Sequence, residues 1–140
     1  MSIFRVMAHS RPPEPETQYV TPFVGYSEPF FEDKDKARRL DELLTELFKQ
    51  IPDWTFAWDY HHRRYGICRY RSKHISVSLY RARRTSYACT KRTILHEIAH
   101  ALTPGHKHDD VWRQMAETLG IESPTTYVMR GDRLCVEQEQ

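Results

Sequence analysis

The chain has 140 residues, 39% of them hydrophobic and 29% charged, with a formal net charge of +2 when the histidines are neutral. This length predicts one domain, and the low mean hydropathy of −0.72 predicts a modest core under a well-charged surface. Because neither an apolar run of membrane-spanning length nor a signal-peptide core is evident, we expect no membrane partner and a cytoplasmic, intracellular protein.

Residues 1–32 are predicted to form an extended, proline-rich N-terminal arm. Five of the eight prolines fall between residues 9 and 29, a density that neither a helix nor a central strand tolerates. The arm also carries five aromatic residues that can pack across a domain. The sequence leaves open whether the arm does so or is disordered. The aromatic residues are Tyr19, Phe23, Tyr26, Phe30 and Phe31.

An amphipathic helix is predicted after the arm. Its apolar residues recur at helical spacing from Leu40 to Ile51. Asp33 or Asp35 is the expected cap, and Pro52 ends the helix. Such a stripe of leucines is typical of core packing.

Three strands are predicted next, forming a small antiparallel sheet. The first is an alternating aromatic segment from Trp54 to Tyr60. The others cover about 66–71 and 74–80, the latter with Ile75, Val77 and Leu79 on one face. The predicted fold class is therefore α+β, with one helix before the sheet and two after it.

The stretch from residue 61 to residue 92 is strongly basic. It contains ten Lys or Arg and no Asp or Glu, whereas the rest of the chain has eleven basic and nineteen acidic residues. Interspersed tyrosines make a mixture suited to phosphate contacts and base stacking. The alternative is that strand arginines face solvent and only aid solubility. We predict DNA contact through this region, with four candidate arginines: Arg69, Arg71, Arg81 and Arg83.

Residues 96–100 read His-Glu-Ile-Ala-His, inside a segment that is otherwise apolar on most sides. On a helix, His96 and His100 lie on one face, where two imidazoles suit zinc. Glu97 beside them can act as general base on a zinc-bound water. The alternative is chance placement of these residues, either on a solvated helix face or as buried histidines whose hydrogen bonds are satisfied. Burial of these groups without partners is costly, so the pattern favours a Zn²⁺ cofactor.

A third ligand is expected shortly after this helix. Pro104 and Gly105 end the helix and allow the chain to turn back. A second helix follows, with helical spacing from Val111 to Leu119, an end at Gly120 and a cap at Asp109 or Asp110. His108, at the start of that helix, is favoured for its rigidity, although spacing alone does not exclude His106.

Residues 94–120 resemble the active site of SprT-like zinc metallopeptidases, the group that includes the Spartan DNA–protein crosslink proteases. Their second element, a histidine followed four residues later by an aromatic, matches His108 and Trp112. The resemblance therefore assigns the third ligand to His108. A metzincin site would place that ligand at His106, but it needs a glycine at position 103, where this chain has Thr103. The metzincin alternative is therefore rejected.

The likeness extends more weakly over about residues 35–120, through Arg64, Gly66, Cys68 and the strand at 75–79. It implies a zincin-like domain at 33–122 and a C-terminal extension at 123–140. Many members also carry a zinc ribbon, which one late cysteine, Cys135, cannot build. The odd number of cysteines, three, predicts free thiols that pack as small hydrophobic side chains.

The leading functional hypothesis is a zinc-dependent endopeptidase that acts on a protein or peptide substrate, including DNA-associated proteins. Asp109 or Asp110 is expected to orient His108, and Tyr127 and Arg130 are candidates for stabilising the oxyanion. A DNA-binding accessory or regulatory protein with a structural zinc site is the alternative. A third hypothesis is a peptidase-like regulator that cleaves one partner, as in stress-response and phage-repressor systems that share the helical motif. The compact form also resembles copies found in phage and mobile elements.

Overall fold

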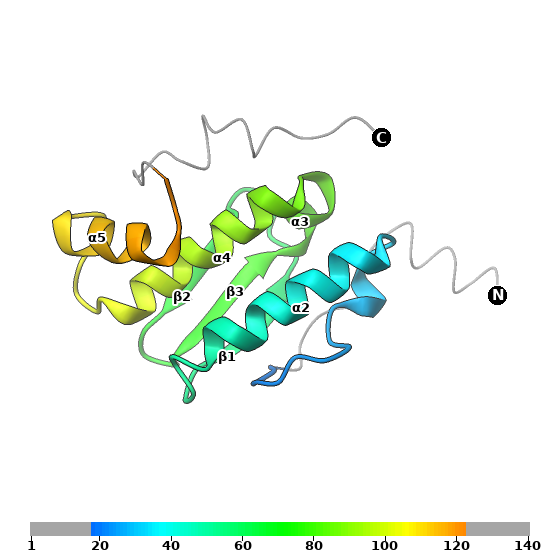
Figure 1. The fold of residues 1–140 in the computed structure, drawn as a ribbon, viewed down its shortest axis with the longest axis horizontal. Helices are drawn as coiled ribbons and strands as arrows, with labels where there is room; N and C mark the ends of the chain where they lie inside the picture. Colours follow the sequence, from blue (N-terminus) through cyan, green and yellow to red (C-terminus); the bar gives the residue numbers. More distant parts are fainter. Residues whose placement is uncertain (1–17, 123–140) are drawn as a thin grey trace.

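The computed structural model of the protein describes residues 18–122. Helices pack on a small three-stranded sheet in an α+β fold (Figure 1), so the predicted fold class is confirmed. The elements in chain order are η1 (Glu28–Phe30), α2 (Lys34–Phe48), β1 (Thr55–Asp59), β2 (Gly66–Arg69), β3 (His74–Ser78), α3 (Leu79–Arg84), α4 (Tyr87–Leu102) and α5 (Asp110–Leu119).

The three-stranded sheet has the order β1-β3-β2. β2 and β3 are antiparallel, but β1 and β3 are parallel, with Thr55 opposite His74 and Asp59 opposite Ser78. The prediction of an entirely antiparallel sheet is therefore wrong for one strand pair. After β1, the loop at 60–65 carries the chain past the position of β3 to the far edge. A tight turn then returns β3 between the other two strands.

One face of the sheet holds the core. Figure 1 shows α2 and α4 side by side across this face, with α5 beyond the C-terminal end of α4. Phe56, Trp58 and Ile75 are completely buried beneath the helices. The predicted amphipathic helix is present as α2, where Asp33 rather than Asp35 provides the cap by accepting from Lys36 N.

The strand predicted to run to residue 80 ends at Ser78. The Ser78 hydroxyl accepts a hydrogen bond from Arg81 N at 3.1 Å and so caps a short helix, α3. Serine is a preferred cap because its side chain satisfies an otherwise unpaired helix N–H. Arg81 and Arg83 consequently lie on a helix instead of on the sheet.

The described part of the arm packs across the domain. Tyr19 forms a bridge with Phe56 on the outer side of β1, and Phe23 is completely buried. Both carboxylate oxygens of Asp41 on α2 accept from Ser27 N, at 2.9 and 3.2 Å. These contacts extend the core beyond the predicted domain start at residue 33. Between residues 18 and 122, no helix has the length and apolar character needed to cross a membrane.

Candidate metal centre

The His-Glu-Ile-Ala-His motif lies in the last two turns of α4. Ser86 caps the start of this helix by accepting from Cys89 N. Its apolar residues pack into the core, which leaves His96 and Glu97 only 8% and 7% exposed. The motif therefore sits on a helix that is fixed against the sheet.

The segment after α4 turns back towards the motif. Gly105 adopts a φ of +86°, and His108 a φ of 59°, just before α5 begins. The side chain of Asp109 accepts from Trp112 N, so Asp109 and not Asp110 is the cap. Arg113 donates to the His108 backbone oxygen at 3.1 Å. His108 is thus held at the start of a helix, as its spacing suggested.

Three imidazoles meet between α4 and α5. The Nε2 atom of His108 lies 3.1 Å from the Nε2 atoms of both His96 and His100. The ring of Trp112 packs against all three, with centroid separations of 4.7–5.3 Å. Among residues 18–122, these three histidines are the one group of three or more ligand-type side chains that could hold a metal ion, with ligand atoms within 4.8 Å of one another.

The three rings are held in their neutral form. Burial, followed by the charges of His100 and His108, lowers the pKa of His96 to about 3. Burial and His108 lower the pKa of His100 to about 4, and burial also lowers the pKa of His108. A neutral imidazole is the form that binds a metal ion.

The donor set fits zinc. Nitrogen atoms about 3 Å apart can share one ion at Zn–N distances of about 2.0–2.1 Å. The other ring nitrogen of His96, Nδ1, is buried without a hydrogen-bond partner among the described residues. The fit to zinc therefore rests on the three converging imidazole nitrogens.

Glu97 lies beside the cluster and is not part of it. Burial raises the pKa of its carboxyl group to about 8, while the charge of Arg64 acts in the opposite direction. Glu97 Oε2 is close to the β2 backbone, 3.2 Å from where a side chain at Gly66 would begin. A carboxyl group with a pKa near neutrality can both accept and release a proton.

The carboxylates predicted to orient His108 contact other groups. Asp109 Oδ2 accepts from or shares a proton with His106 Nδ1 at 2.7 Å, and Asp110 pairs with Arg113. The ring of His100, in contrast, donates a hydrogen bond to the backbone of His106. No sequence signal indicates this contact, because a backbone atom makes it.

Two further residues near the motif come from β2 and the turn after it. The Tyr70 hydroxyl donates to the His100 backbone oxygen at 2.8 Å. Cys68 forms a hydrogen bond with Tyr70, and burial raises the pKa of its thiol to about 12. The sequence signal that could have identified both is the alternation of Gly66, Cys68 and Tyr70, which places them on one face of the strand predicted at 66–71.

The four predicted DNA-contacting arginines do not gather at one place. Arg69 and Arg71 lie where β2 turns into β3, whereas Arg81 and Arg83 lie on α3, after the opposite end of β3. A five-residue strand separates the two pairs, roughly 13 Å at 3.3 Å per residue. Arg81 also donates to the His62 backbone oxygen. The predicted single basic sheet face is therefore corrected to two separate pairs.

Other predicted residues have mixed outcomes. Cys68 has a free thiol, as predicted, but Cys89 is disulfide-bonded, so the prediction of free thiols is wrong for that residue. Tyr127, Arg130 and Cys135 lie outside the described residues.

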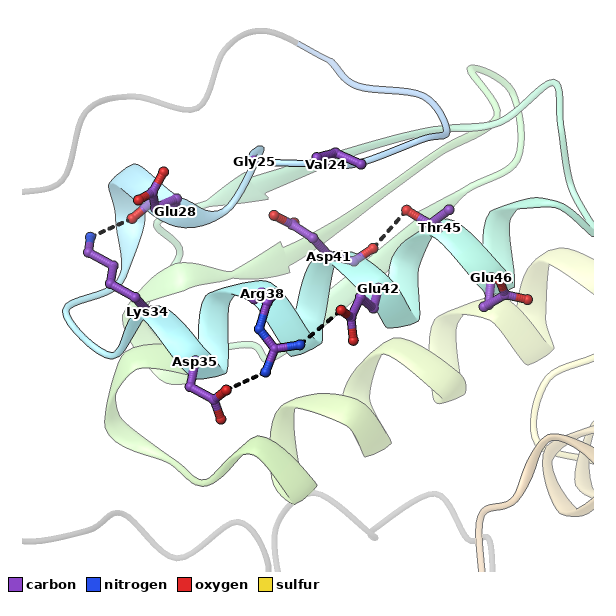
Figure 2. Close-up of a pocket in the computed structure, with 10 residues that line it drawn as sticks. All are labelled: Val24, Gly25, Glu28, Lys34, Asp35, Arg38, Asp41, Glu42, Thr45 and Glu46. Carbon is purple, nitrogen blue, oxygen red and sulfur yellow. Dashed lines mark hydrogen bonds and ion pairs between the residues drawn. The ribbon is translucent and has the colours of Figure 1, made fainter.

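A pocket of about 1000 Å³ lies away from the histidines. Figure 2 shows it between the arm at Val24 and Gly25 and the outer face of α2. Arg38 bridges Asp35 and Glu42 along its wall. The histidine cluster does not line this pocket, so the pocket and the candidate metal centre are separate features.

The sequence was also compared with known proteins. The family model described as the SprT-like family matches residues 34–131. This match spans the sheet, the motif helix and α5. No curated protein and no solved structure gives a significant match.

Proposed function

The chain belongs to the SprT-like family, and we propose that it is a zinc-dependent endopeptidase. His96, His100 and His108 are the proposed ligands, and Glu97 is the proposed catalytic residue. The convergence of three neutral imidazole nitrogens beside a buried carboxyl group is the observation that carries the proposal. A packing role would not require this combination at one place.

Zinc held by the three nitrogens would supply Lewis-acid chemistry for hydrolysis. In the proposed reaction, the Glu97 carboxylate accepts a proton from the attacking water and later delivers it to the leaving amine. Burial favours the protonated form of Glu97, and the charge of Arg64 favours the carboxylate. These opposing influences suit a group that must alternate between the two forms. Trp112, completely buried, closes the side of the cluster towards α5.

A catalytic site is favoured over a structural zinc site. Structural sites normally fill four positions with protein ligands, whereas the group within residues 18–122 has three members. The nearest additional imidazole, that of His106, is hydrogen-bonded to Asp109 at 2.7 Å. An open fourth position is what a hydrolytic site requires.

The test compares wild-type protein with Glu97→Gln, using an unfolded protein such as casein as substrate. The variant should keep its zinc, because Glu97 is not a proposed ligand, and should lose cleavage by at least about 100-fold, the lower part of the range for general acid–base catalysis. A variant that cleaves as fast as the wild type would exclude this mechanism. Loss of zinc in the variant would instead indicate that Glu97 is a ligand.

We further propose that the substrates include DNA-associated proteins. The support is the absence of acidic residues from 61 to 92 and the placement of basic pairs at both ends of β3. DNA bound there would bring enzyme and substrate together. Cleavage of a DNA-binding protein should therefore rise when DNA is added, while casein cleavage should not.

A further inference from the structure

β2 directs alternate side chains towards the motif helix. In its register with β3, Gly66 lies opposite Val77 and Cys68 opposite Ile75, and both partners belong to the core under the helices. Because side chains in a strand alternate between faces, Gly66 and Cys68 face α4. β2 is also in contact with α4. The strand therefore forms a wall beside the candidate metal centre.

At one end of this wall, Gly66 permits a very close approach to Glu97. A Cβ atom at this position would lie 3.2 Å from both Cγ and Oε2 of Glu97, and 3.1 Å from Cγ2 of Thr93. The φ of Gly66 is outside the positive range that favours glycine. A side chain at this position would therefore press on Glu97 and Thr93, so glycine matters here for space and not for backbone conformation.

At the other end, Tyr70 holds the backbone of His100. Its hydroxyl donates at 2.8 Å to the His100 carbonyl oxygen, which also accepts from Thr103 N at 3.1 Å at the end of α4. The Tyr70 ring packs edge-to-face on Trp54, with centroids 6.1 Å apart. The contact of the Tyr70 ring with Trp54 therefore holds the Tyr70 hydroxyl in place.

We propose that β2 and the turn after it position the motif, with Gly66 setting the place of the Glu97 carboxyl group and Tyr70 the place of His100. Both act through other residues and are positioning residues, not catalytic ones. The consequence for hydrolysis rests on the proposed function. The contacts of Gly66 and Tyr70 with α4 do not depend on that function, so the contacts and their effect on hydrolysis can be tested separately.

The Tyr70 contact is tested by measuring Zn²⁺ affinity through competition with a chromophoric chelator. Tyr70→Phe keeps the ring and removes the hydroxyl, and should weaken binding about tenfold, the lower end of the effect of losing a group that orients a ligand. Tyr26→Phe is the matched control, because the Tyr26 hydroxyl also bonds one backbone group, Trp58 N at 3.1 Å. It should lower the melting temperature and leave the affinity unchanged. Unchanged affinity in Tyr70→Phe, or an equal loss in both variants, would overturn this part.

The Gly66 contact is tested on metal-free protein with a double-mutant cycle. Gly66→Ala should lower the melting temperature, and the loss should be at least halved in a Glu97→Ala background, where Cγ and Oε2 are gone. A Gly66→Ala chain that folds only together with Glu97→Ala gives the same answer. Equal losses in both backgrounds would show that Gly66 does not act on Glu97.

Activity measurements then separate the two proposals. Gly66→Ala should keep zinc and KM and lower kcat about tenfold or more, because a misplacement of about 1 Å costs about 100-fold. Unchanged kcat in a protein that is active would overturn the positioning role. If the wild type binds no zinc, the proposed function and the Tyr70 part both fail, while the Gly66–Glu97 coupling is still decided by the cycle.

Discussion

Two regions of the domain bury ionisable side chains in different ways. Asp41 on α2 accepts from Ser27 N through both oxygens and so fastens the arm to the helix. The histidines between α4 and α5 instead contact one another through their Nε2 atoms. Where the backbone satisfies a buried polar group, the group serves the architecture. Where several coordinating atoms face one another, the protein has capacity for a ligand.

Removal of zinc should produce the largest difference between the two regions. We expect chelation to destabilise the fold by about 4 kcal/mol relative to protein with free zinc at 1,000 times Kd. Thermal unfolding with and without chelator, followed by zinc re-addition, measures this effect. Asp41→Asn protein should respond to zinc as the wild type does, because Asp41 bonds Ser27 and is not a member of the histidine cluster. A melting temperature that is indifferent to chelation would contradict the metal site.

Acid should affect the two regions in opposite directions. The histidine pKa values are lower in the folded protein than in the unfolded chain, so their contribution is present above the unfolded value of 6.5 and is lost as pH falls towards 4 and 3. The low pKa of His96 alone should reduce the free energy of unfolding of the metal-free protein by about 2 kcal/mol between pH 7 and pH 5. Urea unfolding with chelator at several pH values measures this loss, and His96→Gln should reduce it. A flat profile would contradict the assignment of neutral, buried rings.

The same comparison shows what sequence could predict. Helical spacing located α2, α4 and α5, and the caps of α2 and α5 added to it, because those signals are local. The parallel pairing of β1 and β3 was not predictable from local signals, because it depends on where the loop at 60–65 crosses the sheet. Ser78, which ends β3 and caps α3, is a local signal for the start of that short helix. His96, Glu97 and His100 were identifiable from spacing, whereas Tyr70 acts across the fold on a backbone oxygen.

A smaller effect is expected at Asp41. Burial raises its pKa above 3.8, so the folded protein prefers the protonated form, and the stabilising contribution is lost as pH rises through the folded value. Asp41→Asn keeps an acceptor for Ser27 N and removes the ionisation. Its stability at pH 7 should equal or exceed that of the wild type, within about 1 kcal/mol. Chemical unfolding at pH 4 and pH 7 measures the difference, and a large loss at pH 7 would show that the ionised carboxylate is needed.

The weakest expected effect concerns DNA and the two arginine pairs. Single-stranded DNA should bind with an affinity that falls steeply with salt, as counterion release requires. Replacing Arg69 and Arg71 with Ser, or separately Arg81 and Arg83, should reduce the salt slope by up to about 1.4, since each lost phosphate contact removes about 0.7. Fluorescence anisotropy at several salt concentrations measures the slope. An effect from one pair alone would confine the contact to that end of β3, and no binding at low salt would remove the DNA proposal.

The most direct test of the metal centre is the zinc content of purified wild-type, His108→Ala and His106→Ala protein. Both substitutions remove one imidazole from the same short loop, so they differ mainly in whether that imidazole reaches the cluster. We predict one zinc per chain in the wild type and in His106→Ala, and most of the zinc lost in His108→Ala. Loss in His106→Ala with retention in His108→Ala would contradict the ligand set His96, His100 and His108.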